Sequence, residues 1–137
     1  MWYTDFSDRL EAWAILRTEA QSLPLVEALQ KINDWWFNSP WKSYYLHWDD
    51  QLLWPDPWQL LSDNVYCDLA RGLGILYTVT LLEHKDLKSV ELVLTEDDRN
   101  LVLVNKEKYI LNWDHKVIVN TPLNNKIKRS FIQEQIK

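Results

Sequence analysis

Cys67 is the residue of this 137-residue sequence whose type and position most strongly predict covalent chemistry. Asp63 or Asn64 predicts the cap of a helix that runs from Ser62 to about Leu82, which places Cys67 in the first turn. The unpaired N–H groups and the dipole at that end of a helix favour a thiolate. A nucleophilic cysteine also needs a histidine to take its proton and an Asp or Asn to orient the imidazole.

The local sequence Cys67-Asp68-Leu69-Ala70-Arg71-Gly72-Leu73-Gly74-Ile75 resembles the Cys-x-x-Ala…Gly-Ile segment of transglutaminase-like and papain-like enzymes. The resemblance implies a cysteine ahead of a helix packed on an antiparallel sheet, with a histidine on the next strands and then an Asp or Asn. Asn112-Trp113-Asp114 resembles the segment of the third residue and makes Asp114 its counterpart. The histidine is then expected near Arg99 or Asn100, and neither position holds one.

The three histidines of the sequence lie at other positions, His47, His84 and His115. In a different register His84 or His115 would approach Cys67, so the candidate catalytic residues are Cys67, Asp114 and His115. The competing interpretation is an inert cysteine, because free cysteines are among the most buried residues of proteins. The missing histidine favours that interpretation, and we expect a catalytically dead member of the fold class.

The composition excludes several other kinds of site. The chain has nine Trp and two Gly, and its only glycines, Gly72 and Gly74, form no GxGxxG or GxxxxGK[ST] phosphate-binding loop. A single cysteine excludes an internal disulfide and a CxxC motif. No histidine pair has zinc spacing and no calcium loop is present, so we expect no metal and no cofactor. No apolar run reaches 18 residues and no leader pattern is found, so we expect no membrane span and no secretion.

The spacing of apolar residues predicts helices in the first part of the chain. One helix is predicted from Phe6 to Ala20, and a second is capped by Ser22, has Pro24 in its first turn and ends before Pro40. The last third changes to short β-branched runs over residues 89–95, 100–105, 108–112 and 116–120, typical of an antiparallel four-stranded meander.

Together these patterns predict an α+β fold in which the Cys67 helix packs on the C-terminal meander. By resemblance, the architecture is a degenerate transglutaminase-like one. Residues 1–120 are predicted to form a single domain. Pro122 is expected to end the sheet, and residues 121–137 to form a basic tail, either a short helix or disordered.

Residues 35–58 are predicted to form an ordered, Trp-rich connector, in which Asp56 caps a helix that Pro57 begins. Its tryptophans either hold a loop on a small core or form an aromatic interface, and stacking on sugars is a third use. The acidic body repels nucleic acid, whereas the tail suits an acidic partner, including the chain's own body. The candidate interaction residues are Trp35, Trp36, Trp41, Trp48, Trp54, Trp58, Lys126, Lys128 and Arg129.

Four longer segments resemble a family of small proteins of tailed phages, notably myoviruses of marine cyanobacteria. The segments are Tyr3-Thr4-Asp5-Phe6-Ser7-Asp8-Arg9-Leu10, Trp54-Pro55-Asp56-Pro57-Trp58-Gln59-Leu60-Leu61, Asn64-Val65-Tyr66-Cys67 and Gly74-Ile75-Leu76-Tyr77-Thr78. The family implies a source and no established activity.

We therefore expect a virion structural or assembly protein that contacts other phage proteins or a host protein and is oligomeric in a particle. The expected location is the virion or the host cytoplasm. Two alternatives stay open: a cysteine-dependent transglutaminase-like or peptidase-like enzyme, and a phage inhibitor of a host protein.

Overall fold

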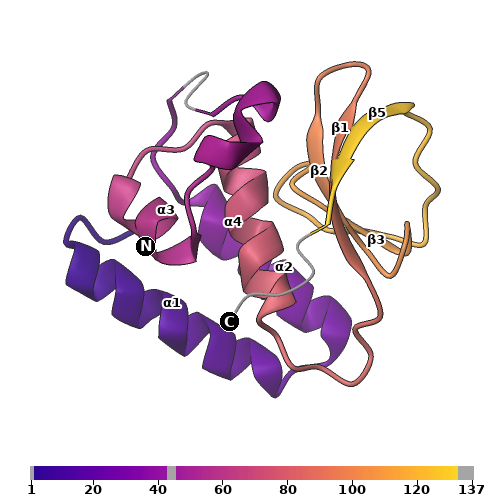
Figure 1. Cartoon of the computed structure of the whole chain (residues 1–137). Helices are drawn as coiled ribbons and strands as arrows, with labels where there is room; N and C mark the ends of the chain where they lie inside the picture. The colour runs from indigo at the N-terminus through magenta and orange to yellow at the C-terminus, as the bar shows by residue number, and fades with distance from the viewer. Residues whose placement is uncertain (1, 43–45, 133–137) are drawn as a thin grey trace.

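A computed structural model describes residues 2–42 and 46–132, which form an α+β fold with a five-stranded antiparallel sheet, as Figure 1 shows. The helices are α1 (Phe6–Gln21), α2 (Leu25–Phe37), the 3-10 helix η1 (Trp48–Leu53), α3 (Pro57–Asp63) and α4 (Asp68–Thr80). The strands are β1 (Val90–Thr95), β2 (Asn100–Val104), β3 (Tyr109–Leu111), β4 (Ile118–Val119) and β5 (Ile127–Phe131). In these ranges no helix is both long and apolar enough to cross a membrane.

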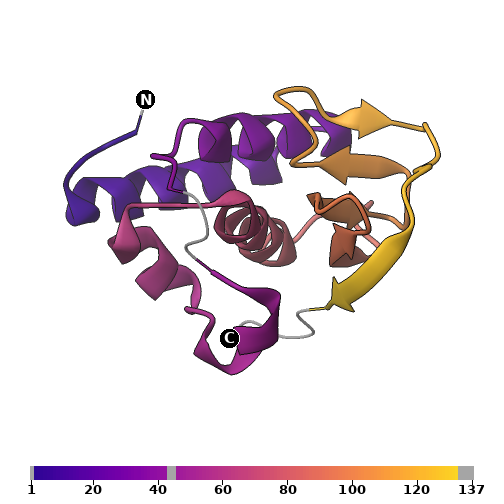
Figure 2. The ribbon, with the colours of Figure 1, turned by 90° about the horizontal axis from the view of Figure 1, so that it is seen from above.

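The helix α4 lies at the centre of the fold, seen nearly end-on in Figure 2. The sheet, in the order β4-β3-β2-β1-β5, covers one side of α4, and α2, backed by α1, covers a second. In Figure 2, α3 lies on the side of α4 opposite the sheet, and η1 lies on the side opposite α1 and α2. Residues 72–79 of α4 are all buried, which agrees with the apolar sequence of this helix on every face.

The predicted helix starts are partly confirmed. The Asp56 side chain accepts a hydrogen bond from the Gln59 N–H at 2.8 Å, with Pro57 in the first turn of α3, as predicted. Ser22, however, ends α1 instead of capping α2, which begins after Pro24. The residue before a proline favours extended backbone, so Leu23 stays outside the helix and Pro24 itself is the N-cap of α2.

The segment from Ser62 to Leu82, predicted as one helix, contains the end of α3 and the whole of α4. Asn64 ends α3 in the left-handed region at φ 57°, a conformation that asparagine adopts more readily than most residues. The next helix begins only at Asp68, and Cys67 itself is its N-cap. Asp63 and Asn64 therefore belong to the end of α3, and the prediction that they cap the Cys67 helix was wrong.

The predicted tail is part of the sheet over residues 127–131. The strand β5 pairs with β1, so the sheet has five strands rather than four, and the predicted boundary at residue 120 does not separate the tail from the fold. Its basic residues dock on the acidic body: Lys128 pairs with Asp98 at 3.2 Å and Arg129 with Asp49 at 2.7 Å. An edge strand with charged, exposed side chains lacks the alternation that identifies a strand in sequence. Residues 133–137 lie outside the described residues.

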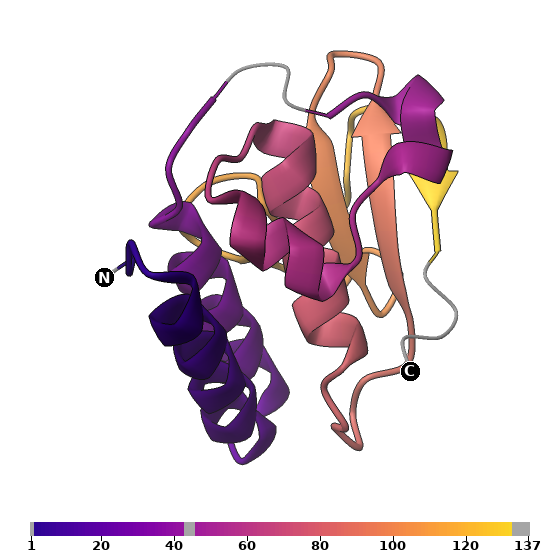
Figure 3. The same ribbon diagram turned by 60° about the vertical axis from the view of Figure 1, so that its left-hand side comes forward.

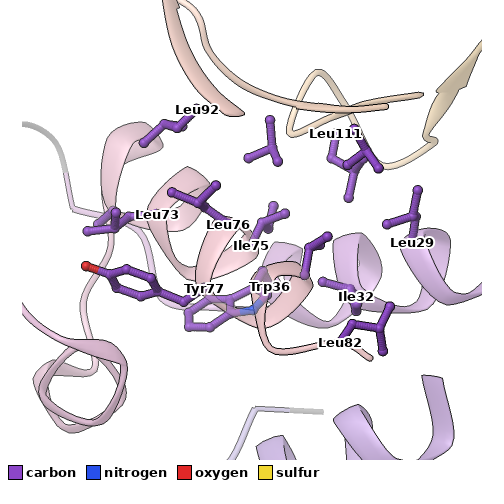
Figure 4. Close-up of a cluster of buried hydrophobic side chains, with 14 of the residues drawn as sticks. Leu29, Ile32, Trp36, Leu73, Ile75, Leu76, Tyr77, Leu82, Leu92 and Leu111 are labelled. Atoms are coloured by element: carbon purple, nitrogen blue, oxygen red, sulfur yellow. The ribbon is translucent and has the colours of Figure 1, made fainter. Parts of the chain in front are cut away.

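The two glycines of α4 allow its neighbours to approach on opposite sides. A Cβ atom at Gly74 would lie 2.6 Å from the ring of Trp36 on α2. At Gly72 it would lie 3.0 Å from a methyl group of Leu92 on β1 and 3.3 Å from the amide nitrogen of Asn112. Figure 4 shows Trp36 against α4, with Leu92 and Leu111 of the sheet on the other side. Glycine is required here for close packing, since neither residue has a positive φ.

The hydroxyl of Thr78 joins three helices inside the core. It accepts hydrogen bonds from the indole N–H groups of Trp13 on α1, at 2.9 Å, and Trp36 on α2, at 3.0 Å. It donates its own proton to the Gly74 carbonyl at 2.7 Å. All three side chains are buried, so one hydroxyl satisfies two indole groups that water does not reach.

Replacing Gly74 with Ala is expected to lower the free energy of unfolding by about 2–3 kcal/mol, because the added methyl overlaps the buried Trp36 ring. Gly72→Ala is the matched control and is expected to cost less, since the end of a flexible leucine side chain can move aside. Chemical denaturation measures both values. An equal loss in the two variants would contradict the role of Trp36.

Replacing Thr78 with Val keeps the shape of the side chain and removes the acceptor of two buried indole groups. The expected loss is about 2–4 kcal/mol of unfolding free energy. Thr80→Val is the control, because the Thr80 hydroxyl only donates to the Leu76 carbonyl, and its loss is expected to stay below about 1 kcal/mol. Denaturation curves that coincide for the two variants would refute the double-acceptor role.

Candidate functional site

The Cys67 thiol closes the N-terminal end of α4. Its sulfur accepts hydrogen bonds from the Ala70 N–H and the Leu46 N–H, both at 3.4 Å, and the side chain is only 5% exposed. The first contact is that of an N-cap residue, and the second ties the connector to the helix. The thiol thus has a structural role as a cap. Cys67 lies one residue before the first turn of α4, whereas the sequence predicted it within that turn.

A network of polar side chains surrounds this end of the helix. The Asp68 carboxylate accepts hydrogen bonds from the backbone and side-chain N–H groups of Asn100, both at 3.0 Å, and pairs with Arg71 at 3.2 Å. The Asn112 side chain donates to the Asn100 carbonyl at 2.8 Å and accepts from Arg71 Nε at 2.7 Å. This network connects α4 with the first residue of β2 and the residue after β3.

Asn100 stands at one of the two positions where the enzyme resemblance requires histidine. Its side-chain oxygen accepts the Trp48 indole N–H at 2.7 Å, while its amide group donates to Asp68. A carboxamide has no basic nitrogen, so it cannot take the thiol proton as imidazole does. The residue instead fixes the Trp48 ring and the start of β2.

Asp114 and His115 are not among the residues that line the pocket of Cys67. The Asp114 carboxylate accepts the His115 backbone N–H at 2.8 Å, and the His115 ring packs on Phe37 at a tilt of 44°, with 4.7 Å between centroids. Buried Asn33 on α2 holds this turn by donating to both backbone carbonyls. Within the segment that resembles the third catalytic residue, Asn112 contacts the first turn of α4, whereas the backbone of Asp114 is bonded to α2.

His47 is the histidine that shares a pocket with Cys67. The pocket has a volume of about 520 Å³, and its lining residues are Trp41, Leu46, His47, Trp48, Asp49, Cys67, Asp68, Leu69, Leu94, Asp98 and Asn100. His84 lies past the other end of α4, a helix about 20 Å long, where its Nε2 is 2.9 Å from the Leu23 carbonyl oxygen. The proximity of His47 was missed because it depends on the tertiary contact between Leu46 and Cys67.

Arg71 supplies the positive charge of the network. Burial lowers the pKa of its guanidinium from the ordinary value, and the neighbouring Asp68 carboxylate opposes that change. The group stays charged, since arginine does not lose its proton in proteins. It stacks on Phe37, 4.1 Å from the ring centroid, and faces the exposed ring of Trp41 at 5.5 Å. The charge is thus neutralised by Asp68 and shielded by aromatic rings.

The predicted aromatic interface is mostly packed inside the fold. Trp36 and Trp48 are core residues, while Trp35 and Trp54 are half-buried against other rings. Only Trp41 and Trp58 of the six are exposed, at 58% and 43%. Four of the six tryptophans thus pack against the small core, where each large ring fills volume. Lys126, Lys128 and Arg129 are exposed on or beside β5.

The described part of the chain holds no group of three or more His, Cys, Asp or Glu side chains placed to bind a metal ion. The chain matches no protein-family model, no curated protein and no solved structure. The site is therefore interpreted from its own geometry.

The Cys67 thiol is expected to react with Ellman's reagent at least about 100-fold more slowly in the native protein than in denaturant, because the helix end must open first. Cys67 is the only cysteine of the sequence, so the assay reports on this group alone. Fast native labelling at neutral pH would contradict a capping role and support an accessible nucleophile.

Proposed function

We propose that this chain is a non-catalytic protein of a tailed-phage particle or of its assembly and acts through protein–protein contacts. The observation that carries the proposal is the pair Leu52-Leu53 on η1, which is fully exposed at Leu52 and 78% exposed at Leu53. Burying a leucine side chain contributes about 1.5–3 kcal/mol. Two adjacent leucines on the surface therefore fit a contact with another protein.

The segment that presents these leucines is held firmly on the fold. Trp48 is buried and bonded to Asn100, and the Trp54 indole N–H donates to the His47 carbonyl at 2.9 Å. The Trp54 ring also packs on Phe131, with 5.0 Å between centroids. A segment fixed in this way loses little conformational entropy on binding, which favours its use as an interaction surface.

The geometry around the thiol supports a non-catalytic role. Cys67 is buried and accepts two backbone N–H groups, and Asn100 stands where the enzyme resemblance requires a base. The phage origin rests on the family resemblance of the sequence. Lys128 and Arg129 pair with Asp98 and Asp49 of the same chain, so the contact surface is sought elsewhere, at Leu52 and Leu53.

The proposal is tested by mass spectrometry of purified particles and of assembly intermediates from infected cells. The chain is expected in at least one of these fractions. The double variant Leu52→Asp, Leu53→Asp is expected to be incorporated at least about tenfold less, since the contact loses two leucines that are buried against the partner.

Val119→Asp is the control for that experiment, because Val119 is also exposed but lies on β4, at the opposite edge of the sheet from β5. Absence of the wild-type chain from both fractions would contradict the proposal. If the chain is instead recovered bound to a host protein alone, the alternative of a phage inhibitor is favoured.

A cysteine-dependent enzyme is the second candidate, favoured by one observation: His47 and Cys67 line the same pocket. In this function His47 would take the thiol proton. Thiol labelling distinguishes the two functions, because an enzyme requires an accessible Cys67 whose reaction rate falls in a His47→Ala variant.

A further inference from the structure

A groove lies between α1 and α2 on the side of the molecule away from the sheet. The two helices lie side by side in Figure 3, and the hollow between them has a volume of about 680 Å³. Its lining residues are Tyr3, Asp8, Glu11, Ala12, Ile15, Leu16, Glu19, Lys31, Asp34, Trp35 and Asn38. None of these residues belongs to the Cys67 pocket or to η1.

The floor of the groove is apolar. Ile15 is 50% exposed although it lies in the middle of α1, and Trp35 on α2 is half-buried beside the Trp2 ring. Leu16 and Ala12 complete the floor. The solvent-facing side of a surface helix is ordinarily polar, so this apolar strip is suited to packing against a further element.

The rim of the groove is acidic on both helices. Asp8, Glu11 and Glu19 line it from α1, and Asp34 lines it from α2. The single lysine, Lys31, pairs with Glu19 at 3.5 Å. Among the described residues no basic side chain pairs with Asp8 or Glu11. Four carboxylates and one lysine thus line the groove, so its charge complements a basic ligand.

We propose that this groove binds a basic amphipathic helix of a protein partner, an inference that rests on the proposed function and names the chemistry of the partner. A groove between two antiparallel helices matches the ridges of a third helix, which packs about 8–10 Å from each. The lining residues of α1 from Asp8 to Glu19 span about 17 Å, or three helical turns of the partner. Apolar side chains at i, i+3, i+4 and i+7 would meet the floor, and flanking lysines or arginines would meet the rim.

Fluorescence anisotropy with a labelled 14-residue peptide tests the inference. The peptide carries leucines at helical spacing and lysines on its other faces, and a scrambled peptide of the same composition lacks the apolar face. The helical peptide is expected to bind with a Kd tighter than about 1 mM and at least about tenfold tighter than the scrambled peptide. Binding is expected to weaken as salt is raised, because the rim contacts are charged.

Two groove variants, Glu11→Lys and Ile15→Ser, are each expected to weaken binding about tenfold. Their matched controls lie outside the groove: Glu107→Lys reverses an exposed charge in the turn before β3, and Ile132→Ser removes an exposed apolar side chain after β5. Circular dichroism verifies that each variant is folded. Amide chemical-shift changes on binding are expected to map to α1 and α2.

Equal binding of the scrambled peptide, shift changes confined to other elements, or groove variants that bind like their controls would overturn the inference. So would the absence of binding at 1 mM peptide. The outcome is separable from the test of the proposed function: a chain found in particles that does not bind the peptide loses only the groove assignment. If the chain is absent from particles but binds the peptide, the groove assignment stands and the proposed function fails.

Discussion

Residues 72–79 of α4 are buried on every face of the helix, and the rest of the structure depends on this constraint. Each neighbour must reach the helix closely and leave no polar group without a partner. The Trp36 ring meets both demands, because it lies against Gly74, where no side chain intervenes, and donates its indole N–H to Thr78. Trp13 shares the same hydroxyl, so α1 and α2 are positioned by one acceptor inside α4.

The same demand explains the N-terminal end of α4, where free N–H groups must find acceptors. Cys67 supplies one acceptor, and Asp68 and Asn112 link the helix to the sheet through Asn100. Asn100 in turn holds Trp48, and Trp48 fixes the segment that presents Leu52 and Leu53 to solvent. The segment that resembles a catalytic arrangement in sequence is thus connected through hydrogen bonds to the support of an exposed surface.

Much of the fold could be predicted from local patterns, and the failures have physical causes. The helix α1, the Asp56 cap with Pro57 and the strands β1 to β3 follow from apolar spacing and capping chemistry that act within a few residues. Strand β5 could not be predicted because its side chains are exposed and charged, and its pairing with β1 joins residues more than thirty positions apart. The position of His47 in the Cys67 pocket and that of Asp114 beside α2 likewise depend on contacts between distant segments.

By itself the sequence determined the α+β class, the absence of a glycine-rich phosphate-binding motif and the lack of histidine at positions 99 and 100. These follow from residue types and short-range periodicity, which need no tertiary contact. Only the tertiary structure decided which tryptophans are core and which are surface, because a ring can fill either environment. It also decided that Cys67 is a buried cap and that acidic side chains of α1 and α2 share one groove, since burial and charge proximity arise only when distant residues pack together.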